Sequence, residues 1–136
     1  MHDLYINKLA SLERCLLRVN DEFQPKSAFL DSLSRQDAAI LNLQRACEVS
    51  IDLANMYIKD NNLGLPSNAR EAFDILHRRN ILSDDLTSKM KKMIGFRNIA
   101  VHEYQSLDIN IVVSVIEKHL FDFEEFGRVF KRLAAQ

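Results

Sequence analysis

The chain has 136 residues and a formal net charge of −1. This length fits one domain with its own core, and 47% of the residues are hydrophobic, so a disordered chain is not indicated. The small net charge argues against binding nucleic acid through overall basicity, although a local basic patch stays open. With only three glycines and two prolines, turns are few and the regular elements must be long, which favours helices over a many-stranded β fold.

The sequence gives no sign of export or membrane insertion. Its first residues lack a basic segment followed by an apolar stretch, and no run of about 18 apolar residues occurs. Cys15 and Cys47 lie within apolar helical patterns and are expected to be buried free thiols, since two cysteines alone do not give zinc-site spacing. We expect a cytoplasmic protein that needs no membrane, metal or cofactor.

The first two predicted helices follow from apolar spacing. Over residues 5–23 the apolar positions alternate steps of four and three, which is one face of a helix. This helix should end before Pro25, because the residue that precedes a proline avoids helical geometry. A longer second helix is predicted with Ser34 as N-cap and Asp37 three residues on, as in a capping box, and its stripe runs to Ile58.

The later helices are marked by their capping residues. The segment 61–66 should stop the second helix, with Gly64 or an asparagine in a left-handed cap. Ser67 or Asn68 begins a short third helix. Ser83, followed by two acids, caps a fourth helix, and Asp108 caps the fifth.

The last predicted helix is apolar on more than one face. Besides its main stripe it carries apolar residues at Ile111, Val115, Phe121 and Val129. Such a helix is either central in a bundle or at an interface between subunits. We predict an all-α fold: an antiparallel bundle of four long helices plus a short one, in a single domain over residues 1–136.

The segment 95–104, GFRNIAVHEY, departs from an ordinary bundle. At about 100° per residue, Arg97 falls in the middle of the buried stripe that runs from Met90 to Val101. A guanidinium stays charged, and burying it unpaired costs several kcal/mol. An anionic group must therefore meet Arg97, either a carboxylate or the phosphate of a ligand.

His102 and Tyr104 are the other candidate functional side chains here. Tyr104 lies in line with Arg97 if the helix extends that far, whereas His102 lies about 140° from Arg97 around the helix. A site shared by Arg97 and His102 therefore needs a helix that bends near residue 101, or a second copy of the chain across a dimer axis.

A plainer alternative is a salt bridge. Glu48 and Asp52 lie one turn apart on the second helix, and either could receive Arg97. His102 would then be an ordinary histidine at a helix end, favoured there by the helix dipole.

The spacing Arg97, four residues, His102, one residue, Tyr104 resembles the R-x4-H-x-Y motif of HepT-type toxins, which belong to the HEPN superfamily of small helical ribonucleases. Here the motif reads RNIAVHEY over residues 97–104. The likeness extends to the chain length, the order of helices, the long second helix with QRACEVSIDLANMYI at 44–58, and the final long helix after the motif. It covers nearly the whole chain.

The resemblance implies a HEPN-like homodimer that cleaves RNA without a metal ion at its dimer cleft. Arg97 would bind the scissile phosphate, and His102 would transfer protons at the ribose 2′-OH or the leaving oxygen. Asn98 would orient the phosphate or His102. Glu48 and Asp52 would be supporting residues that pair with Arg97 or tune His102. The expected product ends in a 2′,3′-cyclic phosphate.

The resemblance gives Tyr104 a separate role. Toxins of this family are paired with a minimal nucleotidyltransferase antitoxin, which can transfer AMP onto the motif tyrosine. The added bulk and negative charge beside Arg97 would exclude RNA and switch the enzyme off.

Basic residues that precede the motif are candidates for contacts with RNA phosphates, although a plain charged surface is the simpler interpretation: Arg78, Arg79, Lys89 and Lys92. Two other functions stay open. One is a non-catalytic helical module that binds nucleotides or a partner protein, and the other is a purely structural bundle. An intact arginine–histidine motif argues against a mere binding module, which need not keep both groups.

Overall fold

The computed structural model describes residues 2–136, and these contain helices but no strand. The predicted all-α architecture of four long helices and a short one is confirmed, and the structure adds a second short helix, α2. The elements are α1 (His2–Phe23), α2 (Lys26–Leu30), α3 (Leu33–Asp60), α4 (Ala69–Arg78), α5 (Asp84–His102), the 3-10 helix η1 (Tyr104–Ser106) and α6 (Ile109–Ala134).

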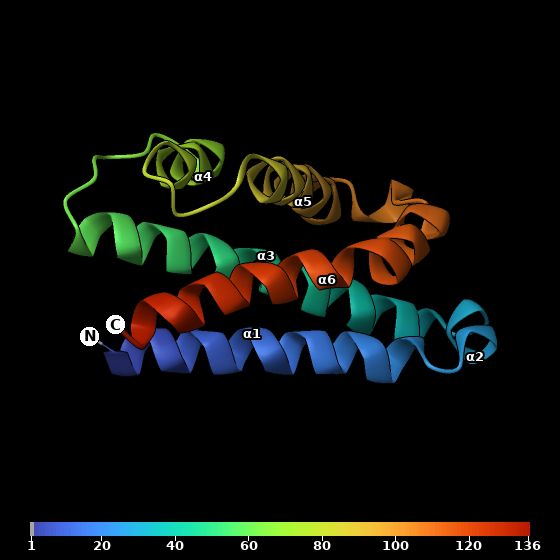
Figure 1. Ribbon diagram of the computed structural model, residues 1–136. Coiled ribbons are helices and arrows are strands. Elements are labelled where there is room, and N and C mark those ends of the chain that lie inside the picture. Colours follow the sequence, from blue (N-terminus) through green and yellow to red (C-terminus); the bar gives the residue numbers. More distant parts are fainter. Residues whose placement is uncertain (1) are drawn as a thin grey trace.

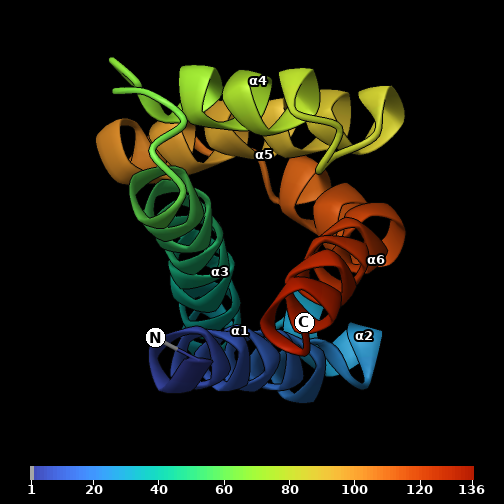
Figure 2. The same ribbon diagram turned by 60° about the vertical axis from the view of Figure 1, so that its left-hand side comes forward.

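The long helices enclose one core. Figure 1 shows α1 and α3 running antiparallel side by side, with α6 along them. In Figure 2 these three helices form the base and the two sides of the molecule, and α4 and α5 lie across the top. Helix α5 contacts α3 and α6, so one face of α5 must be buried.

Three of the predicted capping residues are confirmed. Asn68 accepts from the backbone N–H of its third following residue at 2.9 Å, and Ser83 does the same at 3.1 Å. Asp108 accepts from the second following residue at 2.9 Å. Beyond α3, Asn62 and Gly64 both adopt positive φ, at 52° and 133°, which suits the short side chain of one and the missing Cβ of the other.

The predicted start of the second long helix is wrong by two residues. Ser32, not Ser34, is the N-cap of α3: its backbone is extended and its Oγ accepts from the N–H of Arg35 at 3.1 Å. Ser34 lies exposed within the first turn. The reason is α2, whose Phe29 is fully buried and holds residues 26–30 in a helical turn of their own, leaving Ser32 at the bend.

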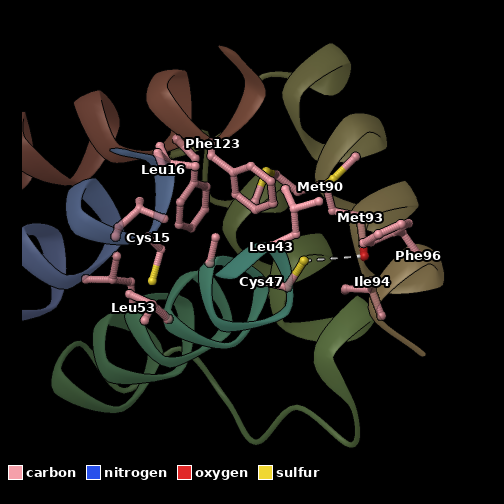
Figure 3. Close-up of a cluster of buried hydrophobic side chains, with 14 of the residues drawn as sticks. Cys15, Leu16, Leu43, Cys47, Leu53, Met90, Met93, Ile94, Phe96 and Phe123 are labelled. Carbon is pink, nitrogen blue, oxygen red and sulfur yellow. Dashed lines mark hydrogen bonds between the residues drawn. The ribbon is translucent and has the colours of Figure 1, made fainter. Parts of the chain in front are cut away.

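Both cysteines are buried free thiols, as predicted. Figure 3 shows them in the core beside Leu43 and Phe123, which are completely buried. The Cys47 Sγ lies 3.6 Å from the carbonyl oxygen of Met93 on α5. Burial raises the pKa of Cys47 to about 12, so its thiol is neutral and unreactive near neutral pH.

Of the apolar residues that lie off the main stripe of α6, two are buried and two are exposed. Val115 and Val129 are buried, so α6 is central in the bundle. Ile111 and Phe121 remain 46% and 56% exposed. The Arg128 guanidinium lies 4.9 Å from the centre of the Phe121 ring and partly covers it, whereas Ile111 faces solvent near the motif.

The corrected cap gives a matched pair of serine variants. We expect Ser32→Ala to lower the free energy of unfolding by about 1 kcal/mol, because the Arg35 N–H loses its acceptor. Ser34→Ala should leave stability unchanged or slightly raised, because alanine favours the helix interior. Urea unfolding followed by circular dichroism measures both. A larger loss for Ser34→Ala than for Ser32→Ala would contradict the assignment.

Candidate active site

Arg97 lies among buried residues of α5, as the sequence predicts. Met93, Ile94 and Ala100 on the same helix are at most 4% exposed, while the Arg97 side chain keeps 31% of its surface. Its Nε is enclosed and lacks a hydrogen-bond partner among residues 2–136. The stem of the side chain is thus in the core, and the outer part of the guanidinium reaches the surface.

Two side-chain oxygens approach this guanidinium. Arg97 Nη1 donates to Asn98 Oδ1 at 3.2 Å, and Arg97 Nη2 lies 3.9 Å from Glu48 Oε2 on α3. The second distance is too long for a hydrogen bond, and Glu48 is 44% exposed, so this ion pair is weak. Gln44 also donates to Glu48, at 3.3 Å. The positive charge is only partly compensated, which suits the binding of a further anion.

The structure separates the two acids predicted beside Arg97. Glu48 is the carboxylate that approaches Arg97. Asp52 instead accepts a hydrogen bond from Lys8 of α1 at 2.9 Å, on the exposed surface. The helical periodicity predicts both acids on one face of α3. Asp52 pairs with Lys8 because α1 packs against α3, which the periodicity of α3 does not predict.

His102 is the last residue of α5 and is exposed. The helix stays regular to its end, where the Glu103 N–H donates to the Ile99 carbonyl oxygen at 2.8 Å. Helical hydrogen bonding therefore continues past residue 101. Arg97 and His102 keep their separation of about 140° around the helix, and within one chain they face different directions.

Tyr104 does not continue the line of Arg97, because α5 ends before it. Tyr104 begins η1, and its hydroxyl donates to the carboxylate of Asp37 on α3. The side chain is 42% exposed. The local spacing predicts Asp37 as part of a capping box. Its contact with Tyr104 joins residues 67 positions apart, and no local sequence pattern predicts it.

The basic residues predicted to bind RNA are not gathered at the motif. Arg78 and Arg79 stand at the end of α4, next to the start of α5, whereas the motif arginine comes about 20 Å further along that helix. Lys89 is paired with Asp85 at 2.9 Å. Lys92 lies about 140° around α5 from the motif arginine.

Apolar side chains are exposed close to the motif. Ile99, Val101 and Ile111 keep 40%, 44% and 46% of their surface. Ile99 and Ile111 line a groove of about 660 Å³ between α5 and α6, together with the buried Phe96. Exposed apolar residues gathered in this way are typical of a surface that associates with another protein.

No helix formed by residues 2–136 has the length and hydropathy needed to cross a bilayer. Within the same residues, no three side chains of histidine, cysteine, aspartate or glutamate are grouped so that they could hold a metal ion.

The chain matches the family model described as "Ribonuclease HepT-like" over residues 6–130. It is 44% identical over 131 residues to a Shewanella oneidensis protein named mRNA nuclease HepT, an alignment that covers 96% of this chain and 98% of that protein. An Archaeoglobus fulgidus protein named putative RNase is 30% identical over 77 residues, 57% of this chain.

Solved structures show the same similarity. A tri-AMPylated HEPN toxin of Shewanella oneidensis, in complex with its MNT antitoxin, gives a TM-score of 0.92 at 44% identity, covering 97% of this chain and 99% of that one. A toxin–antitoxin complex with AMP-PNP gives 0.91 at 43% identity, over 96% and 98% of the two chains. Because the family model and the alignments span nearly all of the sequence and include the motif helix, the chain belongs to the HepT-like family of ribonucleases.

Proposed function

We propose that this chain is the toxin of a toxin–antitoxin pair: a metal-independent endoribonuclease that is inactivated by AMP transfer onto Tyr104. The observation that carries this proposal is the state of Arg97, whose Nε is enclosed without a partner and whose outer nitrogens are weakly paired. Such a planar guanidinium can donate two parallel hydrogen bonds to an anion. In RNA that anion is the scissile phosphodiester.

The chemistry divides between two side chains. The imidazole of His102 is suited to take a proton from the ribose 2′-OH or give one to the leaving 5′ oxygen, because one ring nitrogen of an imidazole can accept a proton while the other donates. Attack of the 2′ oxygen on phosphorus breaks the bond to the 5′ oxygen and leaves a 2′,3′-cyclic phosphate. Arg97 stabilises the charge that builds on the phosphate, and Asn98 holds the guanidinium through its 3.2 Å hydrogen bond.

A homodimer unites these two side chains. Helix α5 is regular through His102, so Arg97 and His102 of one chain face different directions. A second copy related by a two-fold axis places each histidine near the arginine of the other chain. The exposed Ile99 and Ile111 beside the motif supply apolar surface for such an interface.

The named relatives support RNA as substrate and a nucleotidyltransferase as partner. The Shewanella oneidensis relative is an mRNA nuclease by name, and the similar solved structures are toxin–antitoxin complexes, one of them with a tri-AMPylated toxin. In this chain Tyr104 is exposed enough to be reached, two residues beyond His102. An AMP group on its hydroxyl replaces the hydrogen bond to Asp37 and places a phosphate where RNA must enter.

Cleavage without a metal ion is the first test. We expect the purified protein to cut RNA in EDTA, with ends that carry a 2′,3′-cyclic phosphate. His102→Ala should lower the rate by roughly 10²- to 10⁴-fold, and Arg97→Ala by about 10²-fold or more, because they remove proton transfer and charge stabilisation. His77→Ala, on α4 beside the start of α5, is the control and should cut like the parent. Equal cutting by all variants would refute catalysis here.

Mixing inactive variants tests the composite site. If arginine and histidine act across the dimer, Arg97→Ala mixed with His102→Ala forms heterodimers with one intact pair, and activity should return to about a quarter of the parent rate. Each variant alone should remain inactive. No recovery, in a mixture shown to exchange subunits, would mean that the two side chains do not act across the interface.

The acceptor of AMP is tested by intact mass. With ATP and the MNT antitoxin of the Shewanella oneidensis complex, the mass should rise by about 329 Da per AMP, and RNA cutting should fall as the label accumulates. Tyr104→Phe should remove the gain, whereas Tyr57→Phe, in the last turn of α3, should keep it. A label that persists in Tyr104→Phe would exclude Tyr104 as the sole acceptor.

A further inference from the structure

Three arginines gather on the outer side of the bundle, away from the basic residues that the sequence singled out. Arg14 and Arg18 on α1 and Arg45 on α3 line one hollow of about 560 Å³, and all three are exposed. Among residues 2–136, none of them lies within 4.0 Å of a carboxylate oxygen. We call this set the arginine surface.

The charge of this hollow is not cancelled by its lining. Asp21 is the acid among the lining residues, and it pairs with none of the three arginines. Arg14 and Arg45 also lie close enough to the Cys15 sulfur to oppose the rise in its pKa that burial causes. Two helices thus converge on one small region with a net positive charge, in a chain whose overall charge is −1.

The arginine surface and the candidate active site both involve helix α3. Arg45 precedes Glu48 by three residues, which is about one turn of α3, and Glu48 is the acid that approaches Arg97. Figure 1 shows α1 alongside α3, and Arg14 and Arg18 of α1 line the same hollow as Arg45. There Arg14 and Arg18 are one turn apart, a rise of about 6 Å.

We propose that Arg14, Arg18 and Arg45 bind backbone phosphates of the same RNA whose scissile phosphate Arg97 holds. This inference rests on the proposed ribonuclease function and adds where the substrate lies. Unpaired guanidiniums on rigid helices bind phosphate without first breaking an ion pair, and their forks match phosphate oxygens. The strand then crosses the outer face of α3 between α5 and α1. The contacts are to backbone, so they add affinity and not sequence preference.

The salt dependence of binding tests this surface. A short single-stranded RNA carrying 2′-O-methyl groups cannot be cut, and its binding is followed by fluorescence anisotropy over a series of salt concentrations. The plot of log K against log salt has a negative slope, and each lost phosphate contact lowers the magnitude of this slope by about 0.7. Arg14→Gln with Arg18→Gln and Arg45→Gln should therefore lower it by about 2, and binding at low salt should weaken roughly tenfold.

A second triple variant removes equal charge from another surface. Arg78→Gln with Arg79→Gln and Lys92→Gln should keep the parent slope, because Arg78 and Arg79 stand at the end of α4 and Lys92 lies on another side of α5 from Arg97. Equal slopes for the parent and the arginine-surface variant would overturn the inference, as would equal losses in both triple variants. Retained RNA binding with lost antitoxin binding would also overturn it and assign the surface to a protein partner.

Folding and the wider proposal are controlled separately. Thermal unfolding of the triple variant should match the parent, since the three side chains are exposed; if it does not, Arg45→Gln alone carries the test with an expected slope change of about 0.7. If the parent neither binds nor cuts RNA, the proposed function fails as well. If the parent cuts RNA and the slope is unchanged in the variant, only the arginine surface is refuted.

Discussion

The half-buried guanidinium of Arg97 is the constraint on which the site depends. A permanent charge with an enclosed Nε is tolerated only where its outer nitrogens reach polar groups, and α5 meets this condition by packing its core face against α3. Glu48 and Asn98 supply partial compensation. The remaining charge favours an anion, which in the proposed function is the phosphate of RNA.

Helix α3 organises the surroundings of this site. Asp37, Gln44 and Glu48 are spaced by seven and four residues and so share one face of that helix. Asp37 holds the Tyr104 hydroxyl, and Glu48 faces Arg97. The tyrosine proposed to receive AMP and the arginine proposed to bind RNA are thus anchored to the same rigid element. The two anchoring acids lie about three turns apart along α3.

The regularity of α5 has a functional consequence. Helix α5 extends through His102, which places Arg97 and His102 about 140° apart around its axis. In the proposed dimer the two side chains would act together across the interface, and the exposed apolar residues at this end of α5 and α6 would be covered. Dimerisation would then complete the catalytic site as well as stabilise the protein.

Local patterns determined most of the secondary structure. Apolar periodicity and capping residues such as Asn68, Ser83 and Asp108 act over one or two turns, so the four long helices, α4 and the place of Arg97 among buried residues were all predictable. Val101, predicted on the same buried stripe as Arg97, is instead 44% exposed. The motif also identified the candidate residues. The start of α3 was misplaced because burial of Phe29, a tertiary effect, created α2 and moved the cap to Ser32.

Tertiary structure alone decided which side chains meet. Asp37 with Tyr104 and Asp52 with Lys8 join residues 67 and 44 positions apart, and no periodicity within one helix encodes such pairs. The same holds for the arginine surface, because Arg14 and Arg18 come near Arg45 only when α1 packs on α3. Sequence spacing fixes the angle of a side chain around its own helix, but the neighbour that it faces is set by how the helices pack.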